Sequence, residues 1–300
     1  MSGELRFDGR TAIVTGAGRG VGAAHAVLLA ARGARVVVAD HGAGLDGSGR
    51  SGEPADAVVA RIRAAGGSAV AVCASVAEEA GAEAIVAAAL AEFGRIDIVI
   101  NNAGISDPGP FEELSVAQFR AMAEVHWFGT LFVTRAAWPH LRARGYGRVV
   151  NTVSEAMIGT VPEMTSYAPA KGAVWGFTRS LATEAVGTGI RVNAVAPRAH
   201  TRMSAAQADR IAAEHGFSAA EMAEINAAMP PELVAPAALY LAHESCALDG
   251  EVLRAGFGGV ARIAVVATAG IHRAALSAED VAAHIGEILD LGSAAAIDIA

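Results

Sequence analysis

Residues 11–22 read TAIVTGAGRGVG, an apolar run that passes directly into a glycine-rich turn. Glycine lets a backbone turn sharply and approach a ligand closely, and a helix that begins after such a turn presents free N–H groups to a phosphate. An ordinary tight turn is the alternative, but the position directly after the first predicted strand favours phosphate binding. The predicted contacts are Gly16, Gly18, Arg19, Gly20, Val21 and Gly22.

An acidic residue, Asp40, ends the next predicted strand, 18 residues after Gly22. In dinucleotide-binding folds an acid at about this spacing hydrogen-bonds the adenosine ribose. A carboxylate there repels a 2′-phosphate, whereas Arg19 beside the loop can pair with one. We give Asp40 more weight, because repulsion in a partly buried site costs more than one exposed arginine contributes. The expected cofactor is therefore NAD, with NADP as the alternative.

Short apolar runs alternate with alanine-rich segments of helical length along the whole chain. Apolar strands separated by helices are typical of a parallel sheet buried on both faces, so we predict a doubly wound α/β (Rossmann) fold of about seven strands. We expect a single domain over residues 1–259 and a C-terminal extension over 260–300 packed on or beside it. The predicted strands are 11–15, 35–39, 70–73, 97–101, 148–153, 191–195 and 251–254, and the main predicted helices are 21–32, 54–65, 79–93, 116–144, 167–185 and 231–242.

Composition excludes several classes of protein. The chain is 53% hydrophobic and 18% charged, which excludes wholesale disorder. Its longest uncharged stretch, residues 64–77, is too short for a transmembrane helix. The 22 arginines are scattered and the net charge is −8, which argues against a nucleic-acid surface. We expect neither a membrane nor a nucleic-acid partner.

The two cysteines and the start of the chain bear on compartment and metal. Two cysteines are too few for a disulfide scaffold, and no basic segment followed by an apolar one stands at the start. We therefore expect a cytoplasmic protein. No His or Cys pair has zinc-ligand spacing, so no protein-held metal is expected.

Two further segments place small polar residues at predicted strand ends. Asn102, Ala103 and Gly104 follow the fourth predicted strand, and Ser154 follows the fifth. Turn formation explains such residues equally well, but the carboxyl ends of the strands form the ligand crevice of this fold class. Small residues suit the floor under a nucleotide, and a serine hydroxyl can hydrogen-bond a substrate carbonyl.

Tyr167 and Lys171 are four residues apart on a predicted helix, which places them on one face. Lys171 is the only lysine of the chain. For a tyrosine with a pKa near 10 to act as a base near pH 7 takes roughly 4 kcal/mol of help, part of which a neighbouring ammonium can supply. An ordinary surface pair is the alternative, but a single lysine beside one of three tyrosines favours a selected pair.

Together, the TGxxxGxG loop, the NNAG turn and a serine followed by YxxxK resemble the short-chain dehydrogenase/reductase (SDR) family over roughly residues 9–259. The resemblance implies that Tyr167 is the general acid/base, that Lys171 lowers its pKa and binds the nicotinamide ribose, and that Ser154 polarises the carbonyl. It also implies cofactor contacts from Asn102, Ala103, Gly104, Pro197 and Thr201.

Within the family, His126, Gly129, Thr130 and the run VTRAAWPH at 133–140 resemble the hydroxyacyl-CoA dehydrogenase portion of the peroxisomal multifunctional β-oxidation enzymes. Many family members have an asparagine at the position of His126, where its backbone helps to hold a proton-relay water. A histidine can keep that backbone contact, which leaves the relay role of His126 open. Pro197-Arg198 stands where Pro-Gly is usual. The resemblance also implies a homo-oligomer, a tetramer or dimer, through the 116–144 and 167–185 helices.

Two functions follow as hypotheses. The first is an NAD-dependent oxidoreductase that interconverts a secondary alcohol and a ketone on an apolar small molecule, 3-hydroxyacyl-CoA-like or steroid-like. Arg198 and Arg202 are candidates for the basic groups that an acyl-CoA would need. The alternative is a nucleotide-binding sensor or scaffold without turnover.

Overall fold

A single parallel sheet forms the centre of the protein, which we describe from a computed structural model covering residues 3–205, 212–213 and 216–297. The sheet order is β3-β2-β1-β4-β5-β6-β7-β8, and every pairing is parallel except that of β8 with β7. This is the doubly wound arrangement that the sequence predicts. The strands are β1 (Thr11–Thr15), β2 (Arg35–Ala39), β3 (Ser68–Val72), β4 (Ile98–Asn101), β5 (Gly147–Thr152), β6 (Ile190–Arg198), β7 (Val252–Gly256) and β8 (Gly259–Ile263).

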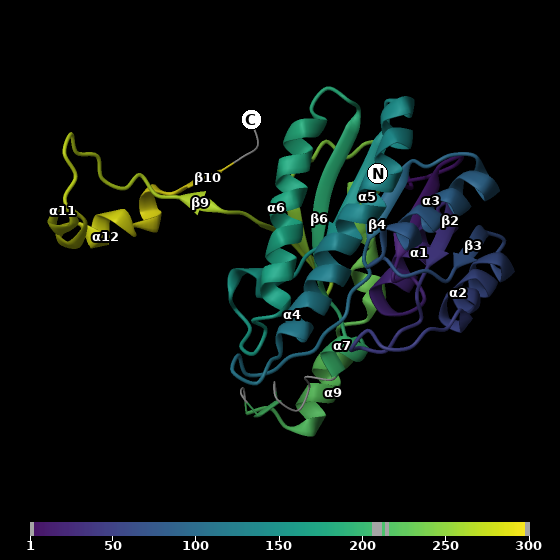
Figure 1. The fold of residues 1–300 in the computed structure, drawn as a ribbon, viewed down its shortest axis with the longest axis horizontal. Helices are drawn as coiled ribbons and strands as arrows, with labels where there is room; N and C mark the ends of the chain where they lie inside the picture. Colours follow the sequence, from purple (N-terminus) through teal and green to yellow (C-terminus); the bar gives the residue numbers. More distant parts are fainter. Residues whose placement is uncertain (1–2, 206–211, 214–215, 298–300) are drawn as a thin grey trace.

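Helices cover both faces of this sheet (Figure 1). Alternate strand residues divide between two cores: Val36 and Val38 pack with the α1, α2 and α10 side, and Val37 packs with the α3, α5 and α6 side. This alternation follows from the two-residue repeat of a strand. The helices that form the two layers are α1 (Gly20–Ala31), α2 (Glu53–Ala64), α3 (Glu79–Phe93), α4 (Val116–Met122), the π-helical η1 (Ala123–Phe128), α5 (Gly129–Arg144), α6 (Tyr167–Ala185) and α10 (Ala235–Ala242).

The sheet contains eight strands rather than the seven predicted, because the chain turns back after β7. The turn residues Phe257 and Gly258 both have positive φ, at 52° and 73°, which is the geometry of a two-residue hairpin. Phenylalanine is an unusual residue for such a turn, so the sequence gives little indication of β8. The predicted domain boundary at 259/260 therefore falls where β8 begins.

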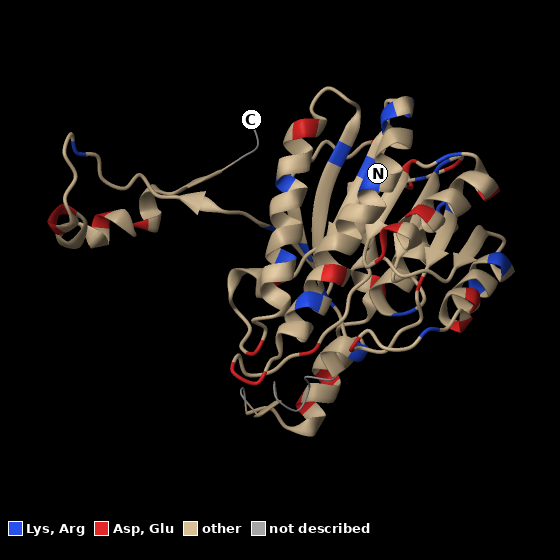
Figure 2. Ribbon diagram, viewed as in Figure 1, with Lys and Arg blue, Asp and Glu red and all other residues tan. Residues whose placement is uncertain are grey.

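Beyond β8, much of the extension projects from the domain in Figure 1, while its end returns toward α6, where the Arg179 guanidinium donates to the Ile297 carbonyl oxygen at 2.6 Å. The extension contains a short antiparallel pair of strands, β9 (Val266–Ala267) and β10 (Ala295–Ala296). Between them lie two short helices, α11 (Ala278–Ala283) and α12 (Ile285–Ile288). Its apolar side chains Leu276, Leu289 and Leu291 are exposed and so do not anchor it to the domain. Figure 2 shows mostly acidic residues on this segment, namely Glu279, Asp280, Glu287 and Asp290 against Arg273.

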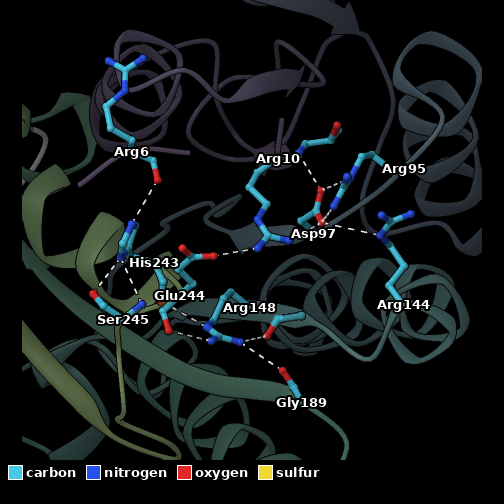
Figure 3. A network of polar contacts seen from close by, with 12 residues as sticks. Arg6, Arg10, Arg95, Asp97, Arg144, Arg148, Gly189, His243, Glu244 and Ser245 are labelled. Atoms are coloured by element: carbon cyan, nitrogen blue, oxygen red, sulfur yellow. Dashed lines mark hydrogen bonds and ion pairs between the residues drawn. The ribbon is translucent and has the colours of Figure 1, made fainter. Parts of the chain in front are cut away.

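A buried polar network ties the strands together at their amino ends (Figure 3). Asp97, fully buried before β4, accepts from the backbone N–H of Thr11 at 2.9 Å and pairs with Arg10 at 3.3 Å and with Arg95. Arg144 of α5 lies 3.8 Å from the same carboxylate. The network thus satisfies a buried charge and leaves the opposite, carboxyl ends of the strands for the site described below.

Within the described residues, no helix is long and apolar enough to cross a bilayer. Nor do three His, Cys, Asp or Glu side chains come together there as a metal site.

Candidate active site

A cavity of about 530 Å³ lies at the carboxyl ends of the strands. It is the crevice that this fold class uses for ligands. The structure brings every predicted site residue to its walls except Gly18, which contacts Asp40 just behind the wall. The lining residues include Gly16, Arg19, Gly20, Val21, Gly22, Asp40, Asn102, Ala103, Gly104, His126, Ser154, Tyr167, Lys171, Pro197 and Thr201.

The glycine loop packs so closely that side chains would not fit. A Cβ on Gly22 would lie 2.2 Å from the carbonyl oxygen of Gly16, and one on Gly16, where φ is +61°, would lie 2.7 Å from Cα of Ala103. No side chain caps the start of α1, so its first-turn N–H groups remain available to an anion. This cradle fits the pyrophosphate of a dinucleotide.

The Asn102 turn holds the glycine loop in place. Its amide Nδ2 donates to the carbonyl oxygens of Thr15, at 3.0 Å, and Gly16, at 3.1 Å. In return, the Thr15 hydroxyl accepts from the backbone N–H groups of Asn102 and Ala103. The NNAG turn therefore fixes the phosphate loop as well as lining the cavity.

Asp40 is held by two backbone N–H groups at the adenosine end. Its two carboxylate oxygens accept from Gly18 and Gly42, each at 2.7 Å. A fixed carboxylate here suits ribose hydroxyls, which can donate to it, and disfavours a phosphate at the same place. Arg19 is exposed at the cavity wall.

Tyr167 and Lys171 lie one turn apart in the first turns of α6 and both face the cavity. Lys171 is 3% exposed, and its Nζ lies 5.7 Å from the Tyr167 ring centroid. Burial lowers the pKa of Lys171 to about 7 and raises the pKa of Tyr167 to about 12, the latter opposed by a hydrogen bond from Ser154. Among the protein's own groups, burial thus outweighs the lowering of the tyrosine pKa expected from Lys171.

Ser154 follows β5 and begins the short helix η2 (Glu155–Ile158). Its hydroxyl accepts from the backbone N–H of Ala156 at 3.2 Å. The hydroxyl can therefore remain a donor toward a substrate oxygen while its own oxygen is held by the backbone.

His126 reaches the site because the helix between α4 and α5 widens into the π-helical η1. Its ring meets that of Tyr167 edge to face, with centroids 5.0 Å apart. Nε2 lies 2.8 Å from the carbonyl oxygen of Ile105 and 3.3 Å from its N–H nitrogen. Burial, and then the charge of Lys171, hold the pKa of His126 well below its usual value, so the imidazole is neutral and serves as a fixed wall of the site.

The loop after β6 lies across the cavity from α6. Pro197 and Thr201 line it, and the Thr201 N–H donates to the Ser204 hydroxyl at 2.8 Å. Arg198, a candidate for binding substrate phosphate, is instead paired with Glu155. Arg202, the other candidate, lines the cavity at the start of α7 (Arg202–Ala205).

The cavity wall also includes residues that the sequence analysis does not predict as site residues, among them Glu155 and most of the segment 43–47. Glu155 could have been suspected from its place directly after Ser154. Ala43, Gly44, Leu45 and Gly47 also line the cavity, and this segment is fixed by a hydrogen bond from the Ser106 N–H to the Leu45 carbonyl oxygen, at 3.0 Å. Its many glycines indicate a loop but not where that loop folds.

Comparison with known proteins identifies the family to which the chain belongs. The family model described as short chain dehydrogenase matches residues 10–211. The chain belongs to the short-chain dehydrogenase family. It is accordingly an oxidoreductase that acts on CH–OH or carbonyl groups with NAD(H) or NADP(H).

Relatives of this short-chain dehydrogenase include both single-domain and larger proteins. It is 41% identical over 286 residues to a short-chain type dehydrogenase/reductase of Mycobacterium tuberculosis, covering 95% of this chain and 96% of that one. It is 40% identical over 263 residues to the mouse peroxisomal multifunctional enzyme type 2, covering 88% of this chain but 34% of the mouse enzyme. The chain thus spans about a third of that relative's length.

Solved structures agree with this assignment. The crystal structure of a short chain dehydrogenase from Mycobacterium avium superposes with a TM-score of 0.77 at 35% identity, covering 96% of both chains.

Proposed function

We propose that this short-chain dehydrogenase interconverts a secondary alcohol and a ketone on an apolar substrate, with a 3-hydroxyacyl thioester as the first candidate and a steroid-like ring as the second. The observation that carries the proposal is the meeting of Ser154, Tyr167 and Lys171 on one wall of the cavity. Apolar side chains also line the cavity and suit an acyl chain or ring: Ala156, Val161, Met164, Met203 and Met229.

The name of one group of relatives favours an alcohol that a hydratase produces as the substrate. The chain is 39% identical to a yeast peroxisomal hydratase-dehydrogenase-epimerase, of which it covers 28%. A dehydrogenase in such an enzyme acts beside a hydratase, and hydration of a double bond produces an alcohol. Arg202 at the cavity wall is the remaining candidate contact for a substrate phosphate.

The chemistry assigns one task to each side chain. Ser154 donates a hydrogen bond to the substrate oxygen and so stabilises charge on it. Tyr167 gives its phenolic proton to that oxygen during reduction and takes one from the hydroxyl during oxidation. Lys171, held by Thr152, places a positive charge beside the phenol and favours its deprotonated form. When bound, the dinucleotide accepts or supplies the hydride.

NAD is the proposed cofactor. Gly18 and Gly42 fix the Asp40 carboxylate directly after β2, and in dinucleotide-binding folds an acid at this position contacts the adenosine ribose. A carboxylate that cannot swing away makes a 2′-phosphate on that ribose costly, and the exposed Arg19 offsets little of the cost.

We also propose that the protein forms a homo-oligomer. A groove between α3 and α5 carries apolar side chains that include Leu90, Phe132, Ala136 and Pro139, and Phe128 beside it is 40% exposed. A second copy of the chain would cover this face. Light scattering during gel filtration measures the mass, and a monomer at all concentrations would contradict the proposal.

Substitution of Tyr167 by phenylalanine tests the function. Wild-type protein is assayed with 3-hydroxyacyl thioesters and cyclic secondary alcohols, and with the matching ketones. We expect Tyr167→Phe to lower turnover by about 10³-fold, while NADH fluorescence titration shows dinucleotide affinity within about threefold, because the ring and its packing remain. Equal turnover by both proteins would remove Tyr167 from the mechanism. NADH binding without turnover of any substrate by wild type would favour the sensor or scaffold.

A further inference from the structure

Glu155, the residue after Ser154, is held between two arginines from other strands. Arg198 makes two parallel hydrogen bonds to its carboxylate, Nε to Oε2 at 2.5 Å and Nη2 to Oε1 at 2.9 Å. Arg254 of β7 donates to Oε1 at 3.2 Å. All three bonds lie at the carboxyl ends of the strands, and both Glu155 and Arg198 line the cavity.

The pair connects the two loops that border the reacting groups. Glu155 is the first residue of η2, directly after Ser154, and Arg198 is the last residue of β6, directly after Pro197. The Arg198 backbone has little room to move, because a Cβ on Gly256 would lie 2.1 Å from the Arg198 carbonyl oxygen. The restrained Arg198 backbone on one side is therefore joined, through its side chain, to the residue that follows Ser154 on the other.

Stability is an insufficient reason for this arrangement. The Arg198 and Glu155 side chains are 42% and 25% exposed, and ion pairs that water can reach contribute little to the free energy of unfolding. Two-point contact between a guanidinium and a carboxylate, in contrast, fixes direction as well as distance.

We propose that Arg198 is a positioning residue, which acts through Glu155 to hold the Ser154 hydroxyl against Tyr167. The proposal rests on the function proposed above. Misplacement of a reacting group by about 1 Å can cost on the order of 10²-fold in rate, so a loosened serine loop lowers turnover even where substrate and dinucleotide still bind.

The chain offers a matched control for this pair. Arg262 of β8 makes the same two-point contact with Glu251, at 2.7 and 2.8 Å, and its side chain is 41% exposed. Neither residue lines the cavity. Arg198→Met and Arg262→Met therefore each remove a two-point ion pair whose arginine is similarly exposed, one pair beside Ser154 and one away from it.

The experiment measures kcat, KM and dinucleotide affinity for both variants, for Arg198→Lys, and for Arg198→Met in a Ser154→Ala background. We expect Arg198→Met to lower kcat about tenfold with KM and NADH affinity within threefold, because positioning and not binding is lost. Arg198→Lys should recover part of the loss, and Arg262→Met should behave as wild type. In the Ser154→Ala background Arg198→Met should have no further effect, since residues that act through one another are not additive.

A second readout needs no turnover. The protein has three tyrosines, so the ¹³Cζ signal of Tyr167 can be assigned with Tyr167→Phe. We expect this signal to move in Arg198→Met and in Ser154→Ala, in the same direction, and to stay in place in Arg262→Met. A shift in the signal without turnover by any protein would refute the proposed function but leave the positioning role standing.

Three results would overturn the proposal. One is an unchanged Tyr167 signal and kcat in Arg198→Met. Another is a full tenfold loss that persists in the Ser154→Ala background. The third is a change confined to KM or dinucleotide affinity, which would make Arg198 a binding residue.

Discussion

The ammonium of Lys171 donates a hydrogen bond of 2.7 Å to the carbonyl oxygen of Thr152. This bond joins α6 to the last residue of β5, two residues before Ser154. The lysine therefore shares its helix with Tyr167 and contacts the strand that leads to Ser154. Its position is set by the backbone of the sheet and not by a counter-ion, which leaves its charge sensitive to burial.

The first prediction concerns the charge state of Lys171. Burial lowers its pKa from the ordinary 10.5 to about 7. Protein labelled with [¹⁵Nζ]lysine should give a single side-chain signal, because the chain has one lysine, and this signal should titrate near pH 7. A midpoint near 10 would show that burial does not discharge it.

The same shift predicts how stability depends on pH. The folded pKa of Lys171 is depressed, so wild-type stability is penalised fully below pH 7 and the penalty disappears as pH rises to 10.5. The difference in free energy of unfolding between Lys171→Met and wild type should therefore shift in favour of wild type between pH 7 and 9.5, by at most about 1.4 kcal/mol per pH unit. Urea denaturation at several pH values measures it. A difference independent of pH would contradict the depressed pKa.

Asp40 gives a prediction for cofactor choice. We expect wild type to prefer NAD over NADP by about 10²-fold in kcat/KM, which corresponds to roughly 2.7 kcal/mol, and Asp40→Ser to narrow that ratio at least tenfold by removing the repulsion. Asp46→Ser is the control, because Asp46 lies in the same glycine-rich segment but is exposed, does not line the cavity, and among the described residues forms hydrogen bonds with Ser48 alone. If Asp40→Ser leaves the ratio of kcat/KM for NAD over NADP unchanged, residues other than Asp40 discriminate between the two cofactors.

How far the sequence predicts this molecule depends on how local each feature is. The ranges of β1, β2, α3 and α6 are confirmed residue by residue, because each has an apolar run or a helical repeat between clear breaks. The site residues lie at strand ends and at the start of α6. The sequence already indicates these positions, through turn residues after the predicted strands and through the four-residue spacing of Tyr167 and Lys171. Because the carboxyl ends of the strands form the ligand crevice of this fold class, these residues meet at one cavity.

The features that the sequence does not predict depend on tertiary contacts. The 116–144 region has helical composition throughout, and nothing in it indicates that η1 widens to bring the His126 ring to Tyr167. Glu155 and Arg198 are 43 residues apart, so no local period reveals their contact. The effect of burial on Tyr167 and Lys171 is likewise invisible until the walls of the cavity are in place.

Substitution of Asp97 should lower stability without affecting dinucleotide binding. Asp97→Asn would leave Arg10, Arg95 and Arg144 without their buried counter-charge, and we expect it to lower the free energy of unfolding by about 3 kcal/mol. Glu244→Gln is the control, since Glu244 pairs with the same Arg10 but is 61% exposed and should cost less than about 1 kcal/mol. NADH affinity of the folded Asp97→Asn protein should match wild type. Equal costs for the two variants, or a lost affinity, would contradict a purely structural network.

Two buried histidines should respond in opposite directions to the same change. Among the described residues neither ring nitrogen of His25, fully buried in α1, has a hydrogen-bond partner. In contrast, His243 has its ring nitrogens 2.8 Å from the Ser245 hydroxyl and 3.1 Å from the Arg6 carbonyl oxygen. Because an unpaired buried polar group costs about 1–3 kcal/mol, His25→Met should raise the free energy of unfolding at pH 7 by about 1 kcal/mol, while His243→Met should lower it.

Lower pH should increase the stability advantage of His25→Met over wild type. Burial lowers its pKa from 6.5 to about 4, so the unfolded chain takes up a proton between these values and the folded protein does not. Wild-type stability from this group is present above pH 6.5 and is lost as pH falls toward 4. The advantage of His25→Met should thus grow by up to about 1.4 kcal/mol per pH unit below 6.5. Urea denaturation at pH 7, 6 and 5 measures this. A constant advantage would mean that His25 is charged or solvated in the folded protein, and a destabilised His25→Met at pH 5 would mean that its ring has a partner in solution.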